Sequence, residues 1–273
     1  MGLAHSKLTG WAWVAPGVVS VFLLAGCGVT FRTDGMLSGK HEIIQQLSSD
    51  VGDARILKAK THNGRIVVRP GTSNRCEGTA TVRTRSTSGA AAERLAGRVD
   101  VRLVRIAGAI SIRVKRPRTS GSESVVVDLD IGVPRHLGVD LKTHNGDVLV
   151  ETLTGPISAE SHNGEVSCTG IAGKARVVTH NGEVTAEFAR ETAPDARFKT
   201  HNGGIRVKIP HEFSAKVSLR THNGRIKTDV PIGVVGAIGS KGNKIEGLIG
   251  NGAGSLELES HNGSISIQGK REK

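Results

Sequence analysis

Aromatic residues are scarce in this sequence. It has no tyrosine, two tryptophans and five phenylalanines among 273 residues. Both tryptophans, Trp11 and Trp13, lie within the first 26 residues. Proteins that bind sugar rings by stacking need exposed aromatic side chains. The scarcity therefore argues against a dedicated lectin or a polysaccharide lyase, and it leaves electrostatic attachment to a polymer open.

The motifs by which common enzyme classes are recognised are also missing. The sequence has no nucleophile elbow, no Walker loop, no paired catalytic carboxylates and no HExxH zinc motif. Acidic residues do not recur at matching repeat positions, as they would around a carboxylate-based lyase or hydrolase site. We therefore expect a non-enzymatic protein with no catalytic residue and no cofactor, and a glycan-active enzyme remains a second alternative.

Cysteine is nearly absent, and one of the three residues stands at an informative place. Residues 1–26 contain one lysine, no acidic residue and an apolar run from Trp11 to Gly26, which is typical of a secretory signal peptide. The run ends in Leu-Ala-Gly-Cys and resembles the bacterial lipobox. That resemblance implies cleavage after Gly26 and lipidation of Cys27, and Gly28 implies the outer membrane if the organism has two membranes. An acyl chain anchors a protein because each buried methylene adds about 0.8 kcal/mol.

The other two cysteines, Cys76 and Cys168, have no assigned role. Cys168 has the parity of a small core residue. A disulfide between Cys76 and Cys168 is an open alternative in an exported protein, because the connection cannot be deduced from sequence.

What the sequence does contain is a repeat. The tetrapeptide [Thr/Ser]-His-Asn-Gly occurs seven times. The copies begin at Thr61, Thr143, Ser161, Thr179, Thr200, Thr221 and Ser260. From Thr143 to Thr221 they follow one another at intervals of roughly 18 to 21 residues, and such a period indicates a repeat architecture. The two longer gaps, before Thr143 and before Ser260, are close to four and two such units.

The flanks of each copy alternate between apolar and polar residues, as at Val139 and Leu141 before one copy and Val148 and Val150 after it. This is the pattern of strands with one buried face. Both a series of antiparallel hairpins and a parallel solenoid fit a strand–turn–strand unit. The near-constant interval favours the solenoid. We therefore predict an all-β, right-handed parallel β-solenoid with about 20 residues per coil and a strand-rich N-terminal cap that contains one short helix.

The tetrapeptide is expected to form the corner of each coil. By parity its Thr/Ser and Asn point inward, where stacked amides bond to one another, and Asn-Gly supplies the positive φ of a tight turn. This predicted turn ladder comprises Asn63, Asn145, Asn163, Asn181, Asn202, Asn223 and Asn262, with Gly64, Gly146, Gly164, Gly182, Gly203, Gly224 and Gly263.

The histidine of each copy has the opposite parity and is expected to point outward. Stacked histidines would form a column whose neighbours share a Zn²⁺, Cu²⁺ or Ni²⁺ ion, so a metal-binding lipoprotein is the first alternative function. Its ligands would be His144, His162, His180, His201, His222 and His261, and His62 belongs to the same column. In acid, protonated neighbouring histidines of such a column would also repel one another.

Five segments are expected along the chain. They are a signal peptide (1–26), a lipid-anchored tether (27–50), a β-rich N-terminal part or cap (51–134), the repeat solenoid (135–269) and a charged tail (270–273). Within them, Glu42–Leu47 is predicted as a helical turn or more linker, Ala90–Leu95 as a helix capped by Ser88, and Ile245–Gly252 as a degenerate coil that fills the long gap before Ser260.

The chain is basic, with a formal charge of +12 at pH 7, and its Lys and Arg residues cluster around Arg98–Arg118. Such a surface attracts anions. We expect contact with the membrane through the lipid anchor, and with an anionic envelope polymer or another envelope protein; nucleic acid is not expected for an exported protein.

The whole repeat region, about residues 50–268, resembles the bacterial DUF4097 family of candidate adhesins. The resemblance rests on Thr143–Val150, Ser161–Cys168, Thr179–Ala186, Thr200–Val207, Thr221–Thr228 and Ser260–Ile267. It implies a β-solenoid-like fold and brings no catalytic residues. This chain departs from the family in having His before the Asn of every copy of the tetrapeptide. The expected function is that of an exported, lipid-anchored solenoid with a structural, adhesive or scaffold role at the cell envelope.

Overall fold

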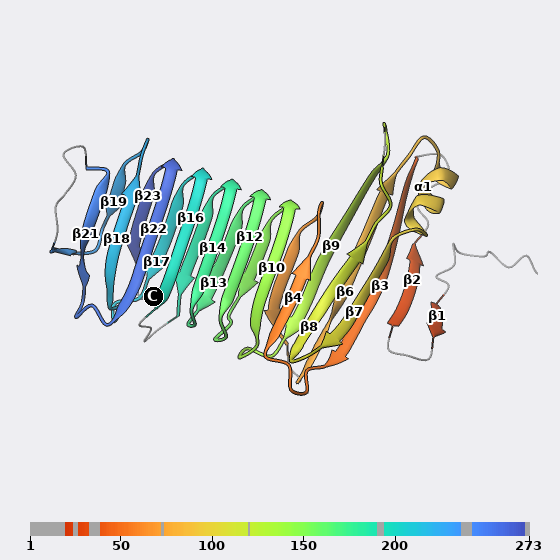
Figure 1. Cartoon of the computed structure of the whole chain (residues 1–273), viewed down its shortest axis with the longest axis horizontal. Coiled ribbons are helices and arrows are strands. Elements are labelled where there is room, and N and C mark those ends of the chain that lie inside the picture. The colour runs from red at the N-terminus through yellow and green to blue at the C-terminus, as the bar shows by residue number, and fades with distance from the viewer. Residues whose placement is uncertain are drawn as a thin grey trace, which may run out of the picture.

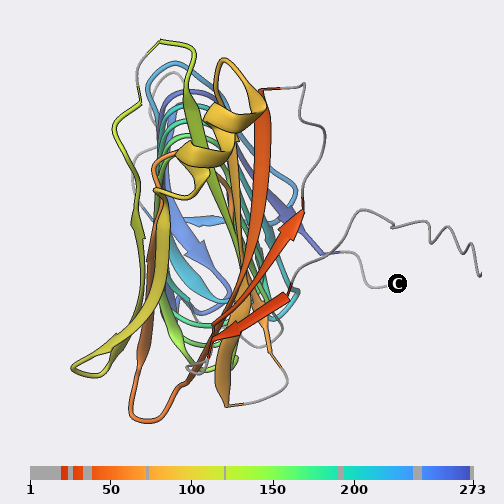
Figure 2. The same ribbon diagram turned by 90° about the vertical axis from the view of Figure 1, so that its right-hand side faces the viewer.

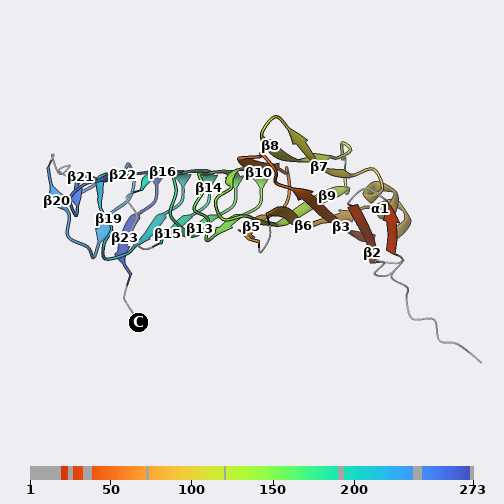
Figure 3. The same cartoon turned by 90° about the horizontal axis from the view of Figure 1, so that it is seen from below.

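The structure is a computed structural model that describes residues 20–23, 27–32, 39–71, 74–119, 121–189, 194–235 and 242–270, with side chains from residue 39 onward. Two long β-sheets, of 12 and 11 strands, lie face to face along one axis and form an elongated, two-layered column (Figure 1). Seen from below, the two layers run side by side for most of the length (Figure 3).

Each copy of the tetrapeptide joins two strands, one in each sheet, and each such pair is one coil. Neighbouring coils pair in parallel in both sheets, so the parallel solenoid is confirmed and the hairpin alternative is wrong. In their order along the axis, the coils are β4 (Ile56–Lys60) with β5 (Ile66–Pro70), β10 (Gly138–Asn145) with β11 (Val148–Glu151), β12 (Ile157–Asn163) with β13 (Val166–Ile171), β14 (Ala175–Asn181) with β15 (Val184–Phe188), β16 (Asp195–Asn202) with β17 (Ile205–Ile209), β22 (Gly254–Asn262) with β23 (Ile265–Gly269), and β18 (Ala215–Thr221) with β19 (Ile226–Thr228).

The core lies between the two sheets and is built from the alternating apolar positions. Val139 pairs in register with Ile157, and Val148 with Val166, and all four side chains are almost completely buried. Burying one Val, Leu or Ile side chain stabilises the fold by about 1.5–3 kcal/mol, so each coil contributes through contacts with its neighbours. The phenylalanines at 188, 198 and 213 are buried in this core, so none of them offers an exposed stacking platform.

The coils do not stack in sequence order. The last coil, β22–β23, lies between β16–β17 and β18–β19. The predicted degenerate coil at Ile245–Gly252 is wrong, because β21 (Lys244–Ile249) runs antiparallel to β18. β21 leads the chain back along β18, and β22 then pairs with β16. Beyond β21 the 11-stranded sheet ends in the short strand β20 (Gly233–Val234).

The N-terminal end of the column is closed by strands that lack the tetrapeptide. β8 (Ala109–Lys115) and β9 (Ser124–Val133) continue the parallel pairing onto β4 and β5. Antiparallel strands then cover them: β7 (Asp100–Ile106) on β8, and β6 (Arg75–Arg85) on β9. The strand-rich N-terminal cap that the sequence predicts is thus present.

The expected helical turn or linker at Glu42–Leu47 is wrong. These residues belong to β3 (Lys40–Asp50), which pairs with β6 along its whole length. Ile43 and Leu47 are buried in the core, and a spacing of four residues on a strand places both on one face. The same spacing also fits one face of a helix, so the sequence pattern did not distinguish a strand from a helical turn here. Further out, β2 (Cys27–Arg32) pairs with β3, and β1 (Ser20–Leu23) pairs with β2.

The one helix expected in the cap is present as α1 (Gly89–Ala96). The Oγ of Ser88 accepts a hydrogen bond from the Ala91 N–H at 3.2 Å, and Gly97 ends the helix. The helix lies at the N-terminal end of the column (Figure 2), and Ala92, Leu95 and Ala96 are its buried residues. In the part of the chain that the structure describes, no helix has the length and apolar character needed to cross a bilayer.

Cys76 and Cys168 are free and buried. Their strands, β6 and β13, are four strand positions apart in the sheet, which is about 19 Å at about 4.8 Å per step. A disulfide needs Cα atoms within about 7 Å, so the disulfide alternative is wrong. Most of the predicted signal peptide and residues 271–273 of the predicted tail lie outside the described residues.

Candidate binding surface at the His-Asn corner

The Thr or Ser of each tetrapeptide closes the corner from inside. All seven are buried, as their parity predicts. The hydroxyl of Thr179 donates to the carbonyl oxygen of Gly164 in the preceding coil at 2.9 Å, and Thr200 does the same to Gly182. A buried hydroxyl needs such a partner, and here the partner is a corner carbonyl that the strand ladder leaves unused.

The glycine of each copy is required by a close approach. A Cβ on Gly182 would overlap the carbonyl oxygen of Gly164, and all seven corner glycines have an equivalent backbone carbonyl in the neighbouring coil or strand. The expectation that Asn-Gly supplies positive φ is wrong for the asparagines and for five of the glycines; only Gly64 and Gly146 have it. The corner is shared between two sheets, so it does not need the tight reversal of a hairpin.

The asparagines form one continuous ladder of amides. The Nδ2 of Asn181 donates to the Oδ1 of Asn163 at 2.7 Å, and Asn202 donates to Asn181 at 2.7 Å. The same bond joins each pair of neighbours from Asn63 to Asn223. The ladder is on the surface: six of the seven are exposed and Asn63 is half-buried, so the inward orientation predicted by parity is wrong. At the corner the chain turns from one sheet to the other, and alternation no longer applies.

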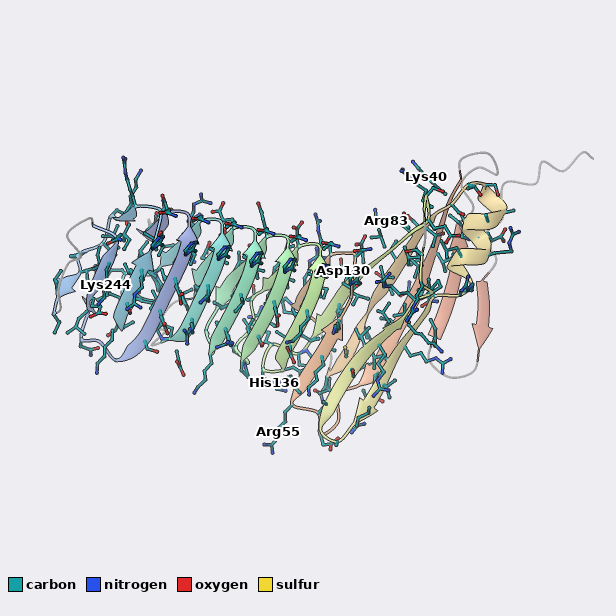
Figure 4. The ribbon with its side chains drawn as sticks, turned by 45° about the horizontal axis from the view of Figure 1, so that its top comes forward. Lys40, Arg55, Arg83, Asp130, His136 and Lys244 are labelled. Carbon is teal, nitrogen blue, oxygen red and sulfur yellow. The ribbon has the colours of Figure 1, made fainter. Side chains whose placement is uncertain are left out.

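The histidines lie beside this ladder and form a second column, called here the histidine column. Neighbouring imidazole rings stack with centroids 4.6–4.8 Å apart and planes 1–12° apart. All seven are exposed. In axial order they are His62, His144, His162, His180, His201, His261 and His222. In Figure 4 the corner is the upper edge of the column, and Arg55 and His136 lie at the opposite edge.

Stacking does not suit the predicted metal site. The lone pair of an imidazole nitrogen lies in its ring plane, and a bound ion stands about 2.0–2.1 Å from that nitrogen. Two nearly parallel rings one rung apart direct their lone pairs side by side, so one ion cannot lie in both planes. Among the described residues, no group of three or more His, Cys, Asp or Glu side chains is placed to hold an ion. The histidines as arranged therefore do not fit a shared metal.

Cationic side chains lie close enough to the histidine column to affect two of its rings. Partial burial lowers the pKa of His62, and the charges of Arg116, His144 and Lys60 lower it further. Desolvation also lowers the pKa of His201, and the charges of His180, His261 and Lys199 lower it further. These neighbours make the protonated imidazolium of His62 and of His201 less favourable, so both rings favour the neutral form.

A shallow groove of about 1170 Å³ runs beside the histidine column. Five imidazoles, from His62 to His201, line one side of it. The other side is formed by outward-facing residues of the 11-stranded sheet, among them Lys60, Lys142 and Lys199, and by Arg113 of β8 and Arg116 just after it. The basic run at Arg98–Arg118 was visible in the sequence, but its position beside His62 was not.

Cys27, the predicted lipidation residue, begins β2. Its side chain lies outside the described residues. β2 is the second strand from the N-terminal edge of the 12-stranded sheet, so Cys27 is at one end of the column and the histidine column extends away from it (Figure 1).

The chain is similar to a known protein family and to solved structures. The profile of the Toastrack DUF4097 family matches residues 39–268. A candidate cell adhesion protein from Clostridium sporogenes ATCC 15579 aligns with a TM-score of 0.50 and 14% identity, over 83% of this chain and 99% of that one. A candidate adhesin from Bacteroides fragilis NCTC 9343 aligns with a TM-score of 0.37 and 11% identity, over 83% and 97%. No curated protein matches the sequence. At so low an identity, the Clostridium alignment shows a common fold alone.

Proposed function

Because the chain belongs to the Toastrack DUF4097 family, we propose that it is a non-enzymatic adhesion or scaffold protein, exported and held at a bacterial membrane by a lipid on Cys27. The observation that carries this proposal is the corner itself. Seven His and seven Asn side chains, all of them exposed except the half-buried Asn63, form two straight ladders across seven coils. A rigid, repetitive surface of this kind suits contact with an extended partner.

Two further points support the proposal. The Clostridium sporogenes structure of this fold is described as a candidate cell adhesion protein. Cleavage after Gly26 would remove β1 and leave Cys27 at the start of β2, from which the column would project outward from a membrane. The partners proposed are an anionic envelope polymer or another envelope protein.

The anchor is tested by expressing the full chain in a lipoprotein-producing bacterium fed an alkyne-labelled fatty acid. We expect label on the wild type and none on Cys27→Ser. Cys168→Ala is the matched control, because Ala186 occupies the register position beside Cys168 in the next coil. Equal labelling of Cys27→Ser and Cys168→Ala would refute the anchor.

The adhesive role is tested by attaching cells that display the wild-type chain to surfaces coated with envelope material. Cells that display no chain give the background. Attachment that does not exceed this background would contradict the proposal, and surface display is checked in both samples by protease accessibility.

A further inference from the structure

A row of positively charged side chains lies at the N-terminal end of the groove. Arg102 pairs in register with Arg113 across β7 and β8, and Lys60 with Lys142 across β4 and β10. Ala59 pairs with Ile112 in parallel strands, so Lys60 lies beside Arg113, one residue further along each strand. The four cations therefore form one row across four neighbouring strands. Like charges directly opposite one another on a sheet are destabilising.

Further along the same row, two lysines each lie beside an acid. Lys142 Nζ lies 2.7 Å from Glu160, and Lys199 Nζ lies 2.8 Å from Glu259. The repeat is therefore able to place an acid opposite a base, and it does so in the later coils. At β4 and β8 it does not.

Three cations form what we call the basic patch: Lys60, Arg113 and Arg116. All three line the groove, and Lys60 and Arg113 are exposed. None of them forms an ion pair with another described residue, whereas Arg102 is bonded to Asp100 at 2.8 Å. Their field reaches the histidine column, since Arg116 and Lys60 both lower the pKa of His62.

The length of the groove indicates which kind of anion fits it. From His62 to His201 it follows four rungs, each 4.6–4.8 Å between ring centroids. At the usual spacing of neighbouring strands, four rungs span about 19 Å. A compact anion would fill only a fraction of that length, and a membrane surface is flat and wide, whereas this site is extended along one axis. A linear chain with charges along its length matches both the groove and the row of cations.

We propose that the basic patch and the groove beside the histidine column bind a linear polyanion, which lies along the column axis. This deepens the surface role proposed above and rests on it. Lys and Arg bind phosphate and carboxylate groups alike, so the polymer is defined by its linear array of anionic groups, and the probes below distinguish the two sources.

The test uses the full chain in mild detergent and fluorescent long-chain polyphosphate, with polygalacturonate as the carboxylate probe. The patch variant is Lys60→Gln, Arg113→Gln and Arg116→Gln. The control variant, with the same change in charge, is Arg55→Gln, Arg135→Gln and Lys227→Gln. These three residues are exposed and lie away from the groove, with Arg55 at the opposite edge (Figure 4).

We expect the patch variant to bind at least one polymer about tenfold more weakly, and its plot of log K against log salt to be shallower by about 2 because three contacts are lost. The control variant should change affinity by less than about twofold. Folding is monitored by the melting temperature, which should not fall in the patch variant because a like-charge contact between Lys60 and Lys142 is removed. A stronger effect on polyphosphate identifies a phosphate polymer, and a stronger effect on polygalacturonate a carboxylate one.

Three results would overturn the inference. They are equal affinities of the patch and control variants, competition by inorganic phosphate as effective as by polymer, and patch-dependent binding to phosphatidylglycerol vesicles but to neither polymer. Cell attachment is measured in parallel. If polymer binding fails while attachment persists, only this inference falls; if the polymer binds and cells do not attach, the proposed adhesive role falls.

Discussion

The imidazole of His201 stacks on that of His261, from a coil much later in the chain, with ring centroids 4.7 Å apart and planes 3° apart. His222, the next copy in sequence, stacks on the other face of His261 at 4.8 Å. The last coil is therefore inserted between two coils that precede it. Among the described strands, the coil β18–β19 is joined to β16–β17 through β22–β23, since each sheet places a strand of the last coil between them.

Removing residues 254–273 should therefore affect coils earlier in the chain. In a solenoid each coil depends on its neighbours, so β18 and β19 should lose protection from hydrogen exchange while β10 to β13 keep it. The newly exposed edges of β16 and β17 should also promote aggregation. Hydrogen exchange with mass spectrometry measures this, and removal of residues 271–273 alone is the control. Retained protection of β18 in the longer deletion would contradict the insertion.

Gly182→Ala should destabilise the corner, because the new Cβ overlaps the Gly164 carbonyl oxygen. Overpacking typically costs about 1–3 kcal/mol, measured here by chemical denaturation. Gly97→Ala is the matched control, since φ there is −62° and the nearest atom to a Cβ is 3.7 Å away; it should be neutral or slightly stabilising. Equal losses for the two variants would mean that the close approach is absent.

The amide ladder predicts a difference between its middle and its end. Asn181→Ala removes two amide-amide hydrogen bonds, whereas Asn223→Ala removes one. A hydrogen bond contributes about 0.5–1.5 kcal/mol net, and these exposed ones belong at the lower end. Denaturation midpoints should therefore fall further for Asn181→Ala. Identical midpoints would show that the ladder does not act as a series of bonds.

Buried thiols should be unreactive in the folded chain. Burial raises the pKa of Cys168 to about 12, and burial with the nearby Glu77 charge raises that of Cys76 to about 12. The thiolate is the reactive form, so a Cys27→Ser chain should resist thiol reagents at pH 8 and take up two labels in guanidinium. Its mass should be the same with and without reductant. A mass increase of two hydrogen atoms on reduction would reveal the disulfide that the topology forbids.

Acid should destabilise the histidine column. The folded pKa values of His62 and His201 lie below the ordinary value of 6.5, so the unfolded chain binds more protons than the folded chain just below that pH. Stability is therefore full above about pH 6.5 and falls as the pH drops toward the lowered folded values. Melting temperatures from pH 8 to 5 test this, with His62→Gln and His201→Gln expected to flatten the profile. A column that melts at the same temperature at both ends of the range would contradict it.

Much of the fold was predictable because its information is local. Val148 and Val150 show the alternation of a strand within one copy of the repeat, and Ser88 shows a helix cap by its position before an Ala-rich run. Asn181 was correctly expected to bond to its counterparts in the next coils, and it does so. Its orientation was not predictable, because strand parity fails where the chain passes from one sheet to the other.

The amino-acid sequence by itself determined the coil: two strands of alternating residues around a corner of Thr or Ser, His, Asn and Gly. Only the tertiary structure decided which coil lies beside which. Every corner presents the same hydroxyl, amide and imidazole to its neighbour, so these contacts do not distinguish one copy from another. The order is set instead by the connections, β21 returning the chain to place β22 beside β16, and β8 bringing Arg113 next to Lys60 and the groove.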